Sequence, residues 1–103
     1  MRDADKKRVL DSCEKAFTAI LTEAETPVEK AMQIIVHDYI GIFATAVLHP
    51  GHVPDKELHR VAEITMDLTS DDSAHFQHDY PISWTAMQAL KPAANQFLHH
   101  GIK

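Results

Sequence analysis

The sequence contains few of the residues that build turn-rich folds. Among its 103 residues there are 3 glycines and 5 prolines, and no repeat or low-complexity segment is visible. Sheets joined by tight turns depend on such residues, so a turn-rich β architecture is disfavoured. A chain of this length is large enough for one modest core and too small for two. We therefore expect a single helical domain spanning residues 1–103.

Cysteine is almost absent as well. The single Cys13 excludes an internal disulfide framework and a multi-cysteine zinc site. It lies in the middle of an apolar stripe, which predicts a small core residue, because a nucleophilic thiol needs partial exposure and a nearby cation. Six of the first eight residues are charged, and this segment lacks the apolar run of a secretory signal. We expect a cytoplasmic protein with no membrane partner.

Basic residues are missing from one long stretch. Residues 61–90 contain five acidic side chains and no lysine or arginine, and the chain has a formal net charge of −5. A phosphate backbone would find little to bind there, so nucleic-acid recognition is disfavoured. The Lys-Lys-Arg run at 6–8 is interpreted as a solvated helix face. The acidic face could bind a basic partner, although most acidic surfaces serve only solubility.

What the sequence does contain is helical periodicity. Apolar residues recur at the three- and four-residue spacing of an amphipathic helix over residues 3–24. A second helix, to about residue 48, is predicted to start with Thr26 as cap and Pro27 at the first position, and Glu29 completes a capping box. Each helix is about 33 Å long. Because almost no loop separates them, they should form an antiparallel hairpin.

Two further helices are predicted in the second half. Pro50 and Gly51 form a turn, and Pro54 begins a third helix that ends near residue 69. The connection over residues 70–82 is long for a bundle and has room for a short helical turn begun by Ser70. A fourth helix is expected to start with Ser83 as cap and to end before residue 101.

Pro92 must kink this fourth helix or divide it in two. The predicted fold class is therefore all-α, a four-helix bundle or compact helical array with the second helix at its centre.

The second helix is apolar around about 200° of its circumference. One apolar face holds Val28, Ala31, Met32, Ile35, Tyr39, Ile42 and Ala46. The face beside it holds Val36, Ile40, Phe43 and Val47, which we assign to a protein interface. The third helix is short and the fourth is interrupted, so they offer little cover, and monomers rarely leave such a row in water. A homodimer or a stable complex with another protein is expected.

His37 and Asp38 interrupt this apolar stretch without forming a reactive pair. His37 falls outside the apolar arc and can reach solvent, whereas Asp38 sits at its edge, half covered. The two side chains point about 100° apart and cannot act on one atom without a third group. The segment from His37 to Gly41 nevertheless resembles histidine phosphotransfer domains. These are four-helix bundles of about this size whose phosphorylated mid-helix histidine precedes a glycine by four positions, but Ile40 stands where that family has a lysine.

Histidine is the one residue type in excess, with 8 in the chain. They group around the turn before the third helix, in the long connection and at the end of the fourth helix, as His49, His52, His59, His75, His78, His99 and His100. Pairs three or four residues apart on a helix suit zinc or a di-iron site. No HExxH motif, nucleophile elbow or phosphate-binding glycine loop accompanies them. We therefore assign no catalytic, cofactor or metal residue.

The function predicted from the sequence is that of a non-enzymatic helical protein-interaction module. We expect a homodimeric regulator or inhibitor that acts by covering the surface of a partner protein. The alternative is a histidine-dependent site, either phosphotransfer at His37 or metal binding by the histidine groups.

Overall fold

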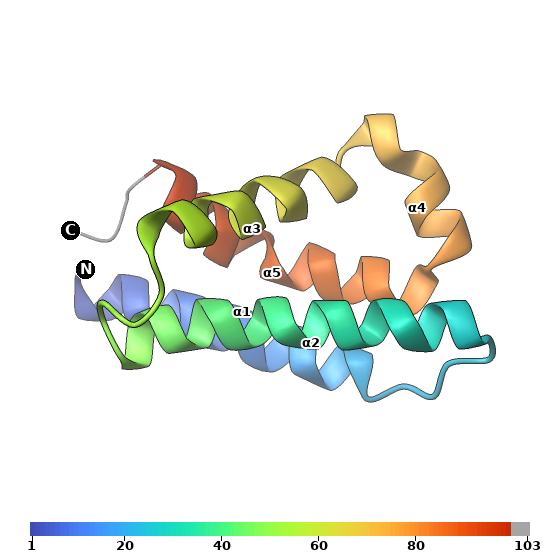
Figure 1. The fold of residues 1–103 in the computed structure, drawn as a ribbon, viewed down its shortest axis with the longest axis horizontal. Coiled ribbons are helices and arrows are strands. Elements are labelled where there is room, and N and C mark those ends of the chain that lie inside the picture. Colours follow the sequence, from blue (N-terminus) through green and yellow to red (C-terminus); the bar gives the residue numbers. More distant parts are fainter. Residues whose placement is uncertain (100–103) are drawn as a thin grey trace.

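The computed structural model describes residues 1–99, which form helices and connections without a strand. The elements are α1 (Asp3–Ile20), α2 (Pro27–Leu48), α3 (Asp55–Leu68), the 3-10 turn η1 (Asp71–Ser73), α4 (Ala74–Asp79) and α5 (Pro81–His99). Figure 1 shows α1, α2 and α5 lying along the long axis of the molecule, with α3 and α4 arching over them. The predicted all-α fold is confirmed.

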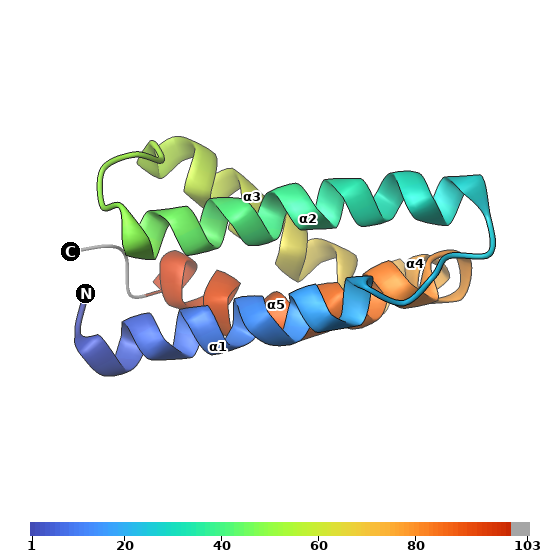
Figure 2. The same cartoon turned by 90° about the horizontal axis from the view of Figure 1, so that it is seen from below.

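α1 and α2 form the predicted antiparallel hairpin (Figure 2). α2 starts as expected: Pro27 is its first residue, and the Thr26 hydroxyl accepts the backbone N–H of Glu29 at 3.1 Å. α1 ends at Ile20, earlier than the periodicity predicts. The Gln33 side chain of α2 donates to the carbonyls of Ile20 at 3.4 Å and Thr22 at 2.8 Å. These bonds satisfy carbonyls at the end of α1 and fix the connection against α2.

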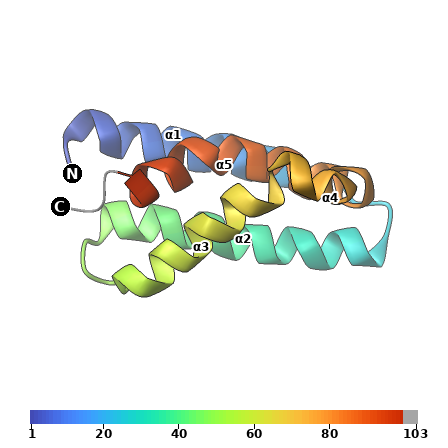
Figure 3. The same ribbon diagram turned by 90° about the horizontal axis from the view of Figure 1, so that it is seen from above.

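α3 crosses the bundle obliquely and leads into the long connection (Figure 3). Pro54 precedes α3, as predicted. Ser70 begins the expected helical turn, η1, and a further short helix, α4, follows it. α4 buries Phe76, whose ring centroid lies 5.3 Å from that of Tyr80. The connection is thus anchored to the core by an aromatic side chain.

α5 takes the central position that the sequence assigned to the second helix. It packs against α1, α2, α3 and α4, whereas α2 packs against α1, α3 and α5. Its many small side chains allow close approach on several sides. Its buried residues are Ser83, Ala86, Met87, Leu90, Ala93, Ala94, Gln96 and Phe97.

α5 is one continuous helix through Pro92 and is not divided there. Pro92 has no N–H to donate to the carbonyl of Gln88, so one helical hydrogen bond is lost. The proline is exposed, whereas Leu90, Ala93 and Ala94 around it are fully buried. Burial of these neighbours holds the helix together at the proline. The predicted end of this helix near residue 101 lies outside the described residues.

The row that the sequence assigned to an interface lies in the core of the chain itself. Val36, Ile40, Phe43 and Val47 are all less than 10 % exposed, at 1 %, 7 %, 0 % and 6 %. The rings of Phe43 and Phe97 stack at 5.6 Å between centroids with an interplanar angle of 4°. Because α5 is unbroken, it covers this face of α2. The sequence had predicted that another chain would cover it.

Candidate protein-interaction surface

The apolar side chains that remain in water lie mainly on the side of α2 that faces away from the core. On the first half of α2, Val28, Ile34 and Ile35 are exposed, with Ile34 at 66 %. Phe17 and Leu21, near the end of α1, are exposed as well, and Leu48 is exposed at the far end of α2. Apolar clusters of this kind on a small domain mark surfaces for association.

We call the first half of α2 on this side the outer face, defined by Val28, Ala31, Ile34 and Ile35. All four residues are exposed. Residues three and four apart are neighbours on a helix, so Ala31 joins Val28 to Ile34 and Ile35. At about 100° per residue, Ala31 and Ile34 lie on the side of α2 away from the buried row that contains Val36 and Phe43. Val28 and Ile35 lie on the flank between that row and Ala31.

Two charges flank the centre of the outer face. Lys30 precedes Ile34 by four residues and Asp38 follows it by four, and both are exposed. Neither charge has an ion-pair partner within residues 1–99. Gly41 lies farther along the same helix, and a Cβ built on it would meet no heavy atom within 4 Å. The surface there is open.

His37 is exposed, as the helical wheel predicts, and its ring lies 5.9 Å from that of Phe17 with an interplanar angle of 53°. Asp38 is exposed as well. Ile40, at the position of the phosphotransfer lysine, is buried. The phenyl ring of Phe17 beside His37 offers no hydrogen bond to a phosphoryl group. Phosphotransfer at His37 stays a prediction.

The histidines make local contacts along the chain. The rings of His49 and His52 lie 5.3 Å apart, His59 contacts Glu63 at 3.2 Å, and His78 contacts Asp79 at 3.1 Å. Over residues 1–99, no group of three or more His, Cys, Asp or Glu side chains is arranged to hold a metal ion. His100, of the predicted terminal pair, lies outside the described residues.

Cys13 is buried in the core, 5 % exposed, and its Sγ lies 3.7 Å from the carbonyl oxygen of Ile40. Burial raises the pKa of the thiol to about 11, because the thiolate would lose its hydration. A thiol in this state is a poor nucleophile at neutral pH. The position agrees with the core role predicted from the apolar stripe of α1.

Glu29 is a buried carboxylate whose role the sequence did not indicate. Its Oε1 accepts the backbone N–H of Ile82 at 2.7 Å, and its Oε2 accepts the hydroxyl of Ser83 at 3.0 Å. The capping-box prediction is therefore wrong for this side chain, which caps the first turn of α5 in place of its own helix. Ser83 is likewise not the cap, because α5 already begins at Pro81.

α2 is the one helix among residues 1–99 whose length and composition would allow it to cross a membrane. Its mean hydropathy is 1.5 over an 18-residue window, of which 28 % is buried inside the molecule. Apolar core helices of soluble proteins have the same property. The high hydropathy reflects both the buried row and the exposed outer face, which lie on different sides of the helix.

The outer face contains residues that the sequence analysis had given to the other apolar face of the helix, such as Val28 and Ile35. The helical wheel grouped Val36, Ile40, Phe43 and Val47 correctly. It gave Ala46, which is buried, to the same face as Val28 and Ile35, and it gave Ile34 to neither face. Nothing in the sequence indicated which face the rest of the chain would cover. Comparison with known proteins adds no relative: the chain matches no known protein family and shows no significant similarity to curated proteins or to solved structures.

Proposed function

We propose that the protein is a non-enzymatic interaction module that forms a homodimer through the outer face of α2. In this role it acts as a regulator or inhibitor that covers the surface of a partner protein. The observation that carries the proposal is the exposure of Val28, Ile34 and Ile35 on one helix, although four other α-helices pack nearby. Covering such a patch stabilises association by the hydrophobic effect.

A second copy of the chain is the occupant that the charges of this face favour. A two-fold axis near Ile34 would place two α2 helices antiparallel, with each Ile34 beside its equivalent. Lys30 and Asp38 lie four residues on either side of Ile34, so each lysine would face the aspartate of the other copy. Both charges lack an intramolecular partner in the described part of the chain. The arrangement is self-complementary, as a two-fold interface requires.

Small residues support the same arrangement. Ala31 lies beside Ile34 on the outer face, and the open surface at Gly41 removes a side chain from the next turns. Small residues let the backbones of two helices approach closely and increase the contact between the larger side chains. The dimer axis proposed here therefore lies opposite the row Val36, Ile40, Phe43 and Val47.

The oligomeric state tests the proposal. We expect sedimentation equilibrium over about 1 to 100 µM to give a dimer for the wild-type chain. Ile34→Glu places two like charges at the centre of the interface and should give a monomer. Because Ile34 is exposed, the helical circular dichroism spectrum should stay unchanged. Lys30→Glu should weaken the dimer, and adding Asp38→Lys should restore it.

Leu48→Glu is the matched control, since Leu48 is exposed to a similar degree on the same helix. It lies fourteen residues from Ile34, about 21 Å along the helix, and should leave the dimer intact. A wild-type chain that stays monomeric throughout this concentration range would overturn the proposal. Dissociation by Leu48→Glu but not by Ile34→Glu would place the interface elsewhere and overturn the assigned axis.

A further inference from the structure

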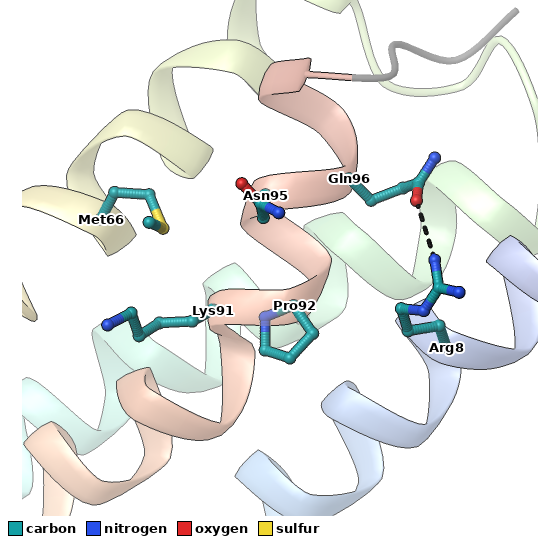
Figure 4. A pocket seen from close by; sticks show the side chains of 6 residues that line it. All are labelled: Arg8, Met66, Lys91, Pro92, Asn95 and Gln96. Atoms are coloured by element: carbon teal, nitrogen blue, oxygen red, sulfur yellow. Dashed lines mark hydrogen bonds between the residues drawn. The ribbon is translucent and has the colours of Figure 1, made fainter.

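A shallow groove runs between α1 and α5, on a different surface from the outer face of α2. It consists of two adjoining hollows of about 550 Å³ and 460 Å³, and Arg8 and Pro92 line both. Met66 of α3 closes one end. Figure 4 shows Arg8 and Lys91 on opposite sides of Pro92, with Asn95 and Gln96 above it. We call this feature the α1–α5 groove.

The groove concentrates positive charge in an acidic protein. Lys7, Arg8, Lys15 and Lys91 line it, and they are four of the ten lysines and arginines in a chain of net charge −5. Asp11 is the acidic residue in its lining, and it pairs with Lys7 at 3.9 Å. A cluster of one sign on a background of the other attracts a ligand of opposite charge.

Two of these cations are free to bind a ligand. Neither Lys15 nor Lys91 has an ion-pair partner among the residues that the structure describes. Arg8 differs, because its Nη1 donates to the Asp5 carboxylate at 3.0 Å and to Gln96 Oε1 at 3.3 Å. These two contacts hold the guanidinium between α1 and α5. Arg8 is thus held in place, and the unpaired Lys15 and Lys91 near it are suited to binding carboxylates.

The wall of the groove also has apolar character. Pro92 borders both hollows and Met66 borders one of them, so the proline ring and the thioether add apolar surface beside the charges. This combination of groups fits a peptide better than an inorganic anion.

We propose that the α1–α5 groove binds an acidic segment of a partner protein in an extended conformation. Arg8 and Lys15 are seven residues apart on α1, about 10 Å along the helix. An extended chain advances about 3.3 Å per residue, so carboxylates three or four residues apart would reach both cations. The proposal names the chemistry of a partner for the proposed interaction function, and its geometry does not depend on the dimer.

A direct binding experiment tests the groove on the full chain. A fluorescent peptide of alternating glutamate and alanine should bind in an anisotropy titration, and a lysine–alanine peptide of the same length should not. Binding should weaken as the ionic strength rises, because exposed charges are screened. Lys15→Gln and Lys91→Gln should each weaken binding about fivefold or more. Neither lysine has an ion-pair partner within residues 1–99, so these variants should fold normally.

Lys56→Gln is the matched control, because it removes the same charge from the exposed start of α3. It should change the affinity less than about twofold. Equal weakening by Lys56→Gln and Lys91→Gln, or no binding of the acidic peptide, would overturn the proposal. Tighter binding of a single-stranded oligonucleotide than of the peptide would also overturn it. Ile34→Glu changes the proposed dimer interface and not the groove, so this variant should bind the acidic peptide as wild type does. The dimer proposal and the groove proposal can therefore fail independently.

Discussion

At the scale of single residues, two buried polar groups have environments that sequence alone indicates only in part. Cys13 falls in the apolar stripe of α1, so its burial follows from periodicity. The fate of Glu29 does not follow, because its hydrogen bonds go to residues more than fifty positions away. A buried carboxylate needs such partners, since an unpaired one would cost several kcal/mol.

Cys13 should make the stability depend on alkaline pH. Its folded pKa of about 11 is above the ordinary value of 9.0. Between these values the unfolded thiol loses its proton while the folded thiol keeps it, so the free energy of unfolding falls as pH rises. The full contribution is present below pH 9. At pH 10 the loss should be about 1.4 kcal/mol.

Urea unfolding of wild type and Cys13→Ala at pH 8 and pH 10 measures this effect. The alanine variant has no thiol and should lose less stability over the interval than wild type does. All other side chains are the same in the two proteins, so the difference between the two losses isolates the thiol. Equal losses in both proteins would show that the thiol is not buried as described.

At the scale of elements, the starts of α2 and α5 are joined by one side chain. The residue before α5 is Tyr80, which has no side-chain group suited to capping an N-terminus. Glu29 supplies the acceptor from α2 instead, and its negative charge also suits the positive end of the α5 dipole. The starts of α2 and α5 are therefore tied together by a contact between residues distant in the sequence.

Substitutions at Glu29 should separate the two bonds. Glu29→Ala leaves the Ile82 N–H and the Ser83 hydroxyl without their acceptor and should cost about 2 to 3 kcal/mol. In Glu29→Gln, the amide oxygen can still accept the Ile82 N–H, and the amide NH2 can donate to the Ser83 hydroxyl oxygen. The expected loss of stability is therefore smaller, about 1 kcal/mol. Chemical denaturation of each variant measures these losses.

Glu25→Ala, at an exposed position near the same connection, is the control and should stay within about 0.5 kcal/mol of wild type. A loss at Glu29→Ala no larger than at Glu25→Ala would mean that the carboxylate does not cap α5.

At the scale of the whole molecule, continuity of α5 decides which side of α2 faces water. α5 passes Pro92 without a break and stacks Phe97 on Phe43. An interruption of this helix at Pro92 would leave Val36, Ile40, Phe43 and Val47 to be covered by another chain, as predicted from the sequence. The same four residues instead complete the core, and the opposite side of α2 becomes the exposed one.

Phe43→Ala should therefore destabilise the fold itself and not merely dissociate a dimer. Phe43 is fully buried, and its truncation should cost about 3 to 5 kcal/mol. This is a large part of the stability of a small domain, about 5 to 15 kcal/mol. Thermal melts followed by circular dichroism measure the loss. Ile34→Ala, on the exposed side of α2, is the comparison, and its stability should stay within about 0.5 kcal/mol of wild type. A folded monomer of wild-type stability for Phe43→Ala would return this row to an interface.

The sequence by itself determined the helical class and most helix starts. Apolar spacing of three and four places the helices, and Thr26, Pro27 and Pro54 act through local backbone chemistry that needs no distant partner. The exposure of His37 follows from the same periodicity. These features depend on residues within one or two turns of each other, which is why they can be derived without a structure.

Only the tertiary structure decided which apolar face of α2 is buried and which cations share a groove. Two apolar faces on one helix are energetically similar until another element covers one of them, and the covering helix comes from the opposite end of the chain. Lys91 joins Lys7, Arg8 and Lys15 for the same reason, since α5 packs beside α1. Hydrophobic burial and charge clustering depend on proximity in space, and periodicity along the chain does not record it.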